Sequence, residues 1–153
     1  SLPGFLLMDY TNDLRLIGTL GHGGAGVIYR AALLNPQLKK QHNIEEVAVK
    51  QVTIWDKLTD EENLQRFHQE VSLLFSLIFH ENIATLIGYT ESPQTIITKM
   101  YRTDLTRFIL NPEEHISPSL AISLAIDIIN GLAAMHNIGI VHRDIKSANV
   151  LLV

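Results

Sequence analysis

The sequence contains no cysteine among its 153 residues, so disulfide bonds and thiolate metal sites are excluded, and the composition suits a reducing cytosol. It also lacks a basic excess: 12 Lys and Arg side chains stand against 16 Asp and Glu, for a formal charge of -4. A nucleic acid or an anionic membrane surface is therefore not expected as the main partner. Asp127 and Asn130 interrupt the most apolar stretch, residues 120–135, so no membrane segment is expected.

The composition is that of a folded protein with an apolar core. Apolar residues make up 46% of the chain and charged residues 18%, and at this length one or two small domains are expected. β-Branched and aromatic runs predict strands, and apolar residues three and four apart predict helices. The expected strands are 14–20, 27–29, 46–54, 83–90 and 95–100, and the expected helices are 59–78, 104–110 and 118–137, with a polar connection over 35–44.

Two of the expected helices carry start signals. Thr59 followed by Glu62 is a capping box, and Ser117-Pro118 places serine at the cap and proline in the first turn. Gly139 can end the second of these helices in a left-handed conformation. The apolar face of that helix is wide, so a position buried on several sides is expected in a complete fold. In the 153-residue segment by itself we expect the helix to lose partners, to expose hydrophobic surface and to be poorly stable.

Three glycines form the first motif that points to chemistry. Gly21, Gly23 and Gly26 fit the spacing G-x-G-x-x-G, and their exposed N–H groups can approach phosphate oxygens. A flexible hairpin turn has the same composition. A dinucleotide fold is a third interpretation, with a helix after the glycines and an acid about 20 residues on, a spacing that 45–46 meets loosely. The strand expected at 27–29 favours a strand–glycines–strand arrangement.

A lysine and a glutamate form the second motif. Lys50 ends the run Val-Ala-Val-Lys in the third expected strand, and Glu70 lies beside the apolar stripe of the helix that follows. A carboxylate in that position is costly to bury unless it meets a cation, so we predict a Lys50–Glu70 ion pair. The alternatives are a solvated lysine at a strand end and a solvated glutamate at a helix edge.

The run 142–149, His-Arg-Asp-Ile-Lys-Ser-Ala-Asn, is the most specific motif. Asp144 can accept a proton from a hydroxyl, Lys146 can neutralise a phosphate, and Asn149 can hold a metal ion. This combination suits phosphoryl transfer, in which positioning and charge neutralisation provide most of the catalysis. The alternative is a polar turn after a helix.

In this order, the motifs resemble those of the protein kinase family from Leu14 to Val153, with the catalytic-loop wording most similar to the tyrosine-kinase-like and receptor-like serine/threonine branch. The resemblance implies an α+β fold. A five-stranded antiparallel N-lobe with one helix would span about 1–98, a hinge 99–103, and the start of a mostly helical C-lobe 104–153, ending after the catalytic loop.

The resemblance also implies a role for each site residue. ATP and Mg²⁺ would be the cofactors, and Asp144 would orient and deprotonate the substrate hydroxyl while Lys146 neutralises the γ-phosphate. Arg143 would pair with a phosphate on the activation loop. The remaining contacts are Gly21, Gly23 and Gly26 over the phosphates, Ile28 and Ala48 above the adenine, Lys50 on the phosphates and Glu70 on Lys50, Thr98 as gatekeeper, the backbone of Met100 or Tyr101 on the adenine edge, and Asn149 on magnesium.

The function that this resemblance implies is transfer of the ATP γ-phosphate to a protein hydroxyl. Lys146 favours serine or threonine as acceptor, and the location expected is cytoplasmic, or the cytoplasmic side of a membrane in a longer receptor. The 153 residues lack the D-F-G aspartate and the activation segment, so the segment alone is expected to be inactive or nearly so. A non-catalytic, pseudokinase-like module that binds nucleotide or a partner is the second hypothesis. A dinucleotide-dependent oxidoreductase, which would require NAD binding, is the third.

Overall fold

The computed structural model describes residues 2–23, 26–139 and 149–153. The chain divides into two compact units. The first comprises Ser1–Ile78 and Thr85–Met100, and the second comprises Phe79–Ala84 and Tyr101–Val153. Residues 79–84, which the sequence analysis assigned to the N-lobe, therefore group with the second unit.

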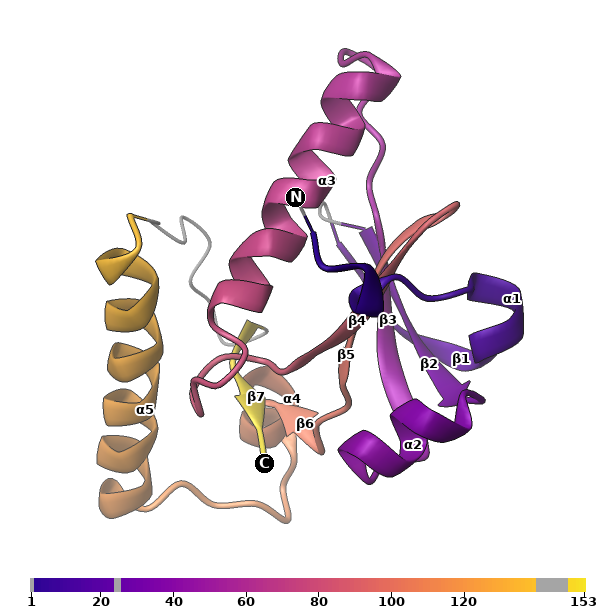
Figure 1. The fold of residues 1–153 in the computed structure, drawn as a ribbon. Helices are drawn as coiled ribbons and strands as arrows, with labels where there is room; N and C mark the ends of the chain where they lie inside the picture. The colour runs from indigo at the N-terminus through magenta and orange to yellow at the C-terminus, as the bar shows by residue number, and fades with distance from the viewer. Residues whose placement is uncertain (1, 24–25, 140–148) are drawn as a thin grey trace. The chain divides into compact units, whose positions relative to one another are not determined.

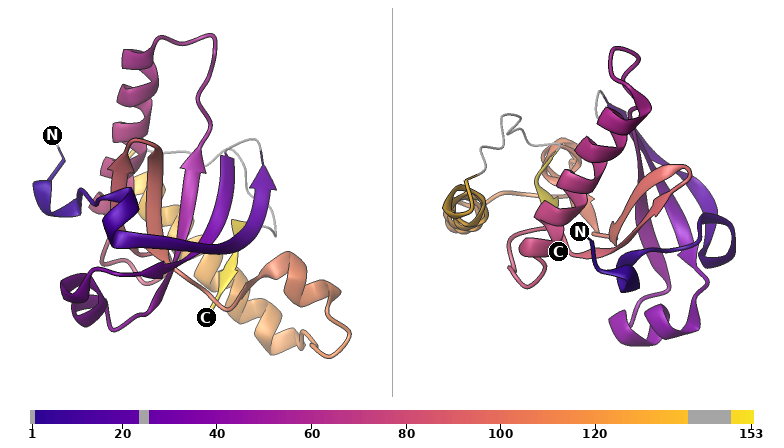
Figure 2. Two further views of the ribbon diagram at one scale, coloured as in Figure 1. Left: turned by 90° about the vertical axis from the view of Figure 1, so that its right-hand side faces the viewer. Right: turned by 45° about the horizontal axis from the view of Figure 1, so that its top comes forward.

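The first unit is built on an antiparallel five-stranded sheet, as predicted (Figure 2). All five expected strands are present, although the fourth starts later than 83 and the third ends before 54. The strand order is β1-β2-β3-β5-β4. The strands are β1 (Leu14–Gly23), β2 (Gly26–Leu33), β3 (Glu46–Val52), β4 (Leu86–Glu91) and β5 (Gln94–Lys99).

Helix α3 (Asp60–Ser76) packs on one face of this sheet (Figure 1). The predicted cap is confirmed, because the Thr59 hydroxyl oxygen accepts a hydrogen bond from the Glu62 backbone N–H at 3.1 Å. The buried face of α3 carries Phe67 and Val71, spaced four apart as the periodicity predicts. These side chains form an apolar cluster with Leu6, Leu86, Tyr89 and Ile96.

The opposite face of the sheet holds a second cluster, to which the connection between β2 and β3 contributes. Here the expected polar connection over 35–44 is wrong, because the structure has a helix, α2 (Pro36–His42). Asn35 caps it by accepting from two backbone N–H groups, and Asn43 ends it in the left-handed region with φ 53°. The helix was missed because Leu38 is its only apolar residue. The buried members of this second cluster are Met8, Leu14, Ala31, Leu33, Val47, Val49, Ile87 and Ile97.

Two short helical turns precede the sheet, in a region for which the sequence predicted no element. They are η1 (Gly4–Leu6) and α1 (Tyr10–Asp13). Asp9 caps α1 by accepting hydrogen bonds from the backbone N–H groups of Thr11 and Asn12.

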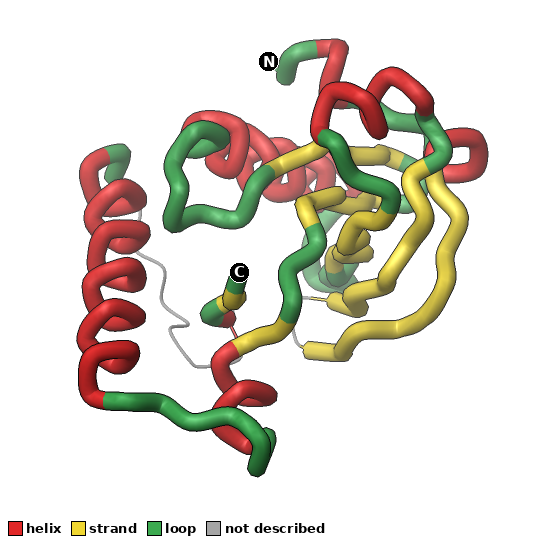
Figure 3. Tube along the Cα trace, turned by 90° about the horizontal axis from the view of Figure 1, so that it is seen from below, coloured by secondary structure: helices red, strands yellow, loops and turns green. Residues whose placement is uncertain are grey.

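The second unit contains α4 (Leu105–Leu110), α5 (Pro118–Asn137) and a two-stranded sheet of β6 (Thr103–Asp104) and β7 (Leu151–Leu152) (Figure 3). Asp104 caps α4 through the Arg107 N–H at 2.9 Å. Ser117 caps α5 through the Leu120 N–H at 3.1 Å, as its position before Pro118 predicted.

Of the two expectations for α5 in the described chain, burial on several sides is wrong and exposure of its hydrophobic surface is confirmed. Only Gly131 of this helix is buried, whereas Ile122, Ile126 and Ile129 are 62%, 52% and 62% exposed. By length and composition α5 could cross a membrane, so Asp127 and Asn130 do not lower its hydropathy as far as we expected. Core helices of globular proteins meet the same criterion, so length and composition alone do not place α5 in a membrane.

Candidate active site

The glycine motif joins two strands of the first unit. β1 ends at Gly23, β2 begins at Gly26, and Gly21 pairs with Ile28 across the ladder. A dinucleotide fold requires a helix at this point, so that interpretation is wrong. A Cβ on Gly26, whose φ is +136°, would lie 2.0 Å from the Gln51 carbonyl oxygen, whereas one on Gly21 would meet no atom within 4 Å. Gly26 is therefore required by the close approach of β3, and Gly21 faces open space.

The predicted ion pair between Lys50 and Glu70 is present. Lys50 Nζ lies 2.6 Å from Glu70 Oε1, a distance at which the ammonium donates a hydrogen bond to the carboxylate. The side chains are 29% and 41% exposed, so each retains access to solvent. Glu70 thus fixes the position of the Lys50 ammonium, and the Lys50 side chain stays partly open to solvent.

The residues around Lys50 form the face of the sheet that carries α3. In the strand register Ile28 lies opposite Lys50, and Ala48 lies opposite Thr98. Residues paired across antiparallel strands point to the same side, so these four side chains share one face. Ile28 is partly exposed, and Ala48 and Thr98 are half-buried. A small apolar surface next to a held cation suits a flat ring linked to phosphates.

A bidentate pair that the sequence analysis missed lies on the same face. Arg30 Nε donates to Glu46 Oε1 at 3.0 Å, and its terminal nitrogen donates to Oε2 at 2.7 Å. These hydrogen bonds lower the pKa of the Glu46 carboxyl and raise the pKa of the Arg30 guanidinium. The pair joins β2 to β3 beside Ala48, and only the strand register reveals it.

The expected hinge starts where β5 ends. The Lys99 N–H donates to the Thr85 carbonyl at 2.9 Å, and the Arg102 N–H donates to the Leu152 carbonyl at 3.2 Å. Met100 is the last residue of the first unit, and Tyr101 opens a stretch of the second. The adenine contacts expected of Met100 and Tyr101 stay predictions.

The catalytic-loop motif falls mostly on 140–148, so Arg143, Asp144 and Lys146 lie outside the described residues. Asn149 is described and exposed. The next residue, Val150, accepts a hydrogen bond from the Leu105 N–H at 2.8 Å, and β7 then pairs with β6. The end of the motif is thereby fixed to the start of α4.

Comparison with known proteins identifies the family. The sequence pattern described as "Protein tyrosine and serine/threonine kinase" matches residues 14–153. The chain belongs to the protein kinase family. A probable serine/threonine-protein kinase of Dictyostelium discoideum, roco7, is 34% identical over 137 residues, which cover 87% of this chain and 5% of that protein.

Two further relatives come from Arabidopsis thaliana. The wall-associated receptor kinase-like 18 is 34% identical over 142 residues, covering 87% of this chain and 16% of that protein. The proline-rich receptor-like protein kinase PERK3 is 30% identical over 149 residues, covering 93% and 26%. The kinase chain thus spans only a small part of the length of the curated relatives that it matches.

ATP and Mg²⁺ are the cofactors that the kinase family uses, and the residues of the first unit fit the nucleotide. Lys50, held by Glu70, offers a cation, and the open side of Gly21 leaves room for phosphates. For the metal ion, residues 2–23, 26–139 and 149–153 contain no group of three or more His, Asp or Glu side chains that could hold it. Asn149 as a magnesium ligand stays a prediction.

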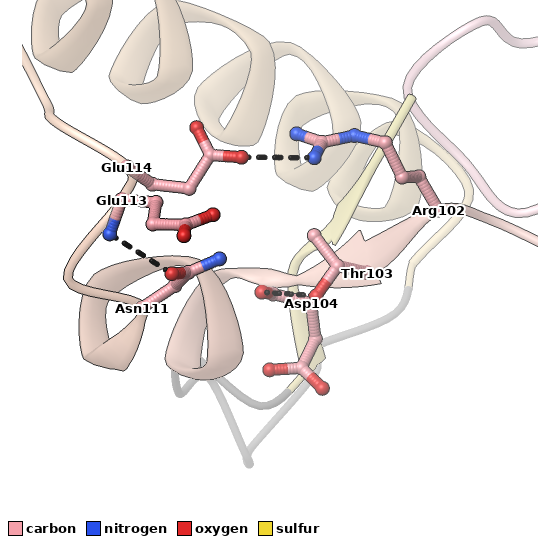
Figure 4. Close-up of polar contacts among 6 residues, drawn as sticks. All are labelled: Arg102, Thr103, Asp104, Asn111, Glu113 and Glu114. Carbon is pink, nitrogen blue, oxygen red and sulfur yellow. Dashed lines mark hydrogen bonds and ion pairs between the residues drawn. The ribbon is translucent and has the colours of Figure 1, made fainter.

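A polar group at the two ends of α4 was also absent from the sequence analysis of this kinase chain (Figure 4). Arg102 pairs with Glu114 at 3.3 Å, and its guanidinium lies 5.6 Å from the Phe108 ring centroid. Asn111 accepts a hydrogen bond from the Glu113 N–H at 3.0 Å. These contacts span up to 12 residues without a periodic pattern, so no sequence signal could have found them.

Proposed function

We propose that the protein to which this kinase domain belongs transfers the γ-phosphate of ATP to serine or threonine hydroxyls of proteins. The observation that carries the proposal is the 2.6 Å pair of Lys50 and Glu70, on the sheet face that also holds Ile28 and Ala48. The names of the relatives support a serine/threonine acceptor, and so does Lys146 in the catalytic-loop motif.

In this proposal the residues of the first unit bind the nucleotide, and residues beyond it transfer the proton. Lys50 binds the phosphates, and Glu70 fixes its ammonium so that little reorganisation is needed when a ligand arrives. The N–H groups between Gly21 and Gly26 add donors over the same phosphates.

The apolar side chains of Ile28 and Ala48 cover the base, and Thr98 limits the space behind it. Bound Mg²⁺ would supply charge neutralisation on the phosphate oxygens.

Three residues beyond the first unit complete the proposed machinery. Asp144 accepts the proton of the acceptor hydroxyl, and Lys146 neutralises the transferred group. Asn149 contributes an amide oxygen to the metal ion.

For the 153-residue chain by itself we propose nucleotide binding without appreciable turnover. No carboxylate follows Asn149 in this sequence, so the second metal ligand that phosphoryl transfer needs is not supplied by the chain. ATP turnover by this chain, measured beside that of the full-length protein, tests the point. Comparable rates from the two would contradict it.

The test of the main proposal is an acceptor series. Peptides that differ only in carrying serine, threonine or tyrosine are offered to the full-length protein with ATP and Mg²⁺. We expect phosphate on serine and threonine and none above background on tyrosine.

The matched variants are Lys50→Met and Lys39→Met, the second being a lysine of α2 that pairs with Glu45 at 3.0 Å. Loss of a charge-assisted contact to phosphate should weaken nucleotide binding about tenfold or more in Lys50→Met. Lys39→Met should bind like the parent. Tyrosine-only transfer, or equal affinity in both variants, would refute the proposal.

A further inference from the structure

Residues 2–13, here named the N-terminal strap, meet the edge strand β4 at Leu7 and Met8 and then continue through α1 to the start of β1. Leu7 forms a parallel bridge with Tyr89, and the Met8 N–H donates to the Tyr89 carbonyl at 2.8 Å. The strap therefore extends the sheet beyond β4 at this point.

Side chains of the strap enter both apolar clusters of the first unit. Leu6 is 2% exposed and packs with Phe67 and Val71 of α3, whereas Met8 is 6% exposed and joins the cluster on the opposite face. The Phe5 ring also meets the Phe75 ring of α3, with centroids 6.0 Å apart. The strap thus packs against both faces of the sheet at its β4 edge and contacts α3 directly.

Gly88 shows how closely the strap approaches β4. A Cβ at this position would lie 2.6 Å from the Leu6 carbonyl oxygen and 2.6 Å from Met8 Sδ. Glycine weakens a strand interior, and a close approach of another backbone is one of the reasons it occurs there. The glycine in β4 is explained by the strap.

The strap and α3 meet over one residue of β4. The Tyr89 ring lies 6.0 Å from the Phe67 ring and 6.1 Å from the His68 ring, and His68 Nε2 is 3.0 Å from Glu91 Oε1. Glu70 lies between the buried Phe67 and Val71 in the sequence of α3. The contacts that hold α3 against β4 and the strap therefore also set where Glu70 stands.

We propose that the N-terminal strap is a positioning element for the Lys50–Glu70 pair. Docking of Leu6 and Met8 holds α3 where Glu70 reaches Lys50. Release of the strap lets α3 shift and weakens nucleotide binding. The inference rests on the proposed function of Lys50 as the phosphate-binding lysine.

Gly88→Ala tests the inference because it adds one methyl group where the strap lies and removes nothing. The control is Gly18→Ala in β1, where an added Cβ meets no atom within 4 Å. Hydrogen exchange reports on the strap through the Met8 amide and on α3 through its backbone amides. Calorimetry with a non-hydrolysable ATP analogue and Mg²⁺ reports on binding.

In Gly88→Ala we expect faster exchange at Met8 and across α3, together with about fivefold or greater loss of nucleotide affinity, the lower range of site-to-site coupling. Gly18→Ala should match the parent in all three measurements. Faster exchange at Met8 with α3 exchange and affinity unchanged would overturn the proposal.

Two further variants keep the test decisive. A chain lacking residues 1–8 removes the docked part of the strap if Gly88→Ala does not fold, and unchanged α3 exchange in it would also overturn the proposal. The chain has no cysteine, so Phe5→Cys with Phe75→Cys allows a short bismaleimide to tie the strap to α3. In the Gly88→Ala background, cross-linking should restore affinity relative to the same protein before cross-linking.

Failure of the proposed function gives a different result. If Lys50→Met binds nucleotide like the parent, the role of Lys50 is wrong. The exchange of α3 in Gly88→Ala still decides whether the strap holds the helix.

Discussion

The two units of this kinase domain bury their apolar residues to different extents. The first surrounds its sheet with two clusters, in which Val47, Val49, Val71 and Ile97 are fully buried. The second contains α5, in which Ile122, Ile126 and Ile129 are more than half exposed. Both units follow their sequence periodicity, so periodicity specifies the helix or strand. Burial depends on which partner element the fold supplies.

The largest effect should come from the same substitution made in each unit. Ile97→Ala removes a fully buried side chain from β5 and should lower the free energy of unfolding by about 2–5 kcal/mol. Ile126→Ala removes a side chain that is 52% exposed on α5 and should change it by less than about 0.5 kcal/mol. Urea unfolding followed by circular dichroism compares them. Equal costs would mean that α5 is as well covered in solution as β5.

Asparagine provides a second matched pair. The buried Asn63 accepts from the Trp55 N–H at 3.0 Å and donates to the Trp55 carbonyl at 3.0 Å. Asn63→Ala leaves these groups without their partner and should cost about 1–3 kcal/mol of unfolding free energy. Asn111→Ala, at an exposed turn of the second unit, should cost about 0.5–1.5 kcal/mol or less. The fluorescence of Trp55 should report only the first change.

Loss of a helix cap should lower the free energy of unfolding by a similar amount in the two units. Thr59→Ala and Ser117→Ala each delete one hydroxyl that accepts a backbone N–H at 3.1 Å. A cap is a local interaction, so each substitution should cost a similar amount, about 1 kcal/mol, as measured by urea unfolding. A Ser117 cost near zero would show that α5 is frayed at its start.

The smallest expected effect is a pH dependence from the first unit. Burial lowers the pKa of His42. As the pH falls, the unfolded chain therefore binds a proton at this residue at a higher pH than the folded chain does. The stability that neutral His42 contributes is therefore present above its unfolded-state pKa of about 6.5. This stability is lost as the pH falls below that value. His42→Gln should show a shallower loss of stability than the parent between about pH 7.5 and 5.5. A parallel loss in both proteins would contradict this.

The sequence predicted the elements that carry strong periodicity or a paired charge. Glu70 was assigned to Lys50 because a carboxylate beside an apolar stripe needs a cation, and the structure contains that pair. Helix α2 was missed because a seven-residue polar helix has too few apolar positions to show a period. The strap was missed because the space requirement of Gly88 becomes visible only when Leu6 and Met8 lie against it.

The element that would cover α5 could not be predicted for a related reason. A wide apolar face shows which side of a helix favours burial, but it does not identify the element that covers it. The close contact of Gly131 with Asn82, whose carbonyl oxygen would lie 2.8 Å from an added Cβ, likewise joins segments far apart in the sequence. The roles of Asp144, Lys146 and Asn149 stay predictions.

The two edge strands of the sheet, β1 and β4, differ in how readily they could pair with a second chain. The ladder of β1 is broken by register shifts between Leu16 and Gly18 and between Thr19 and Gly21, and such irregular edges discourage edge-to-edge pairing with another chain. β4 has no break of this kind beyond Gly88, and the bridge from Leu7 shields it. Detaching that shield should open a template for intermolecular β-pairing. On mild heating, light scattering should therefore rise in Gly88→Ala well before it rises in Gly18→Ala.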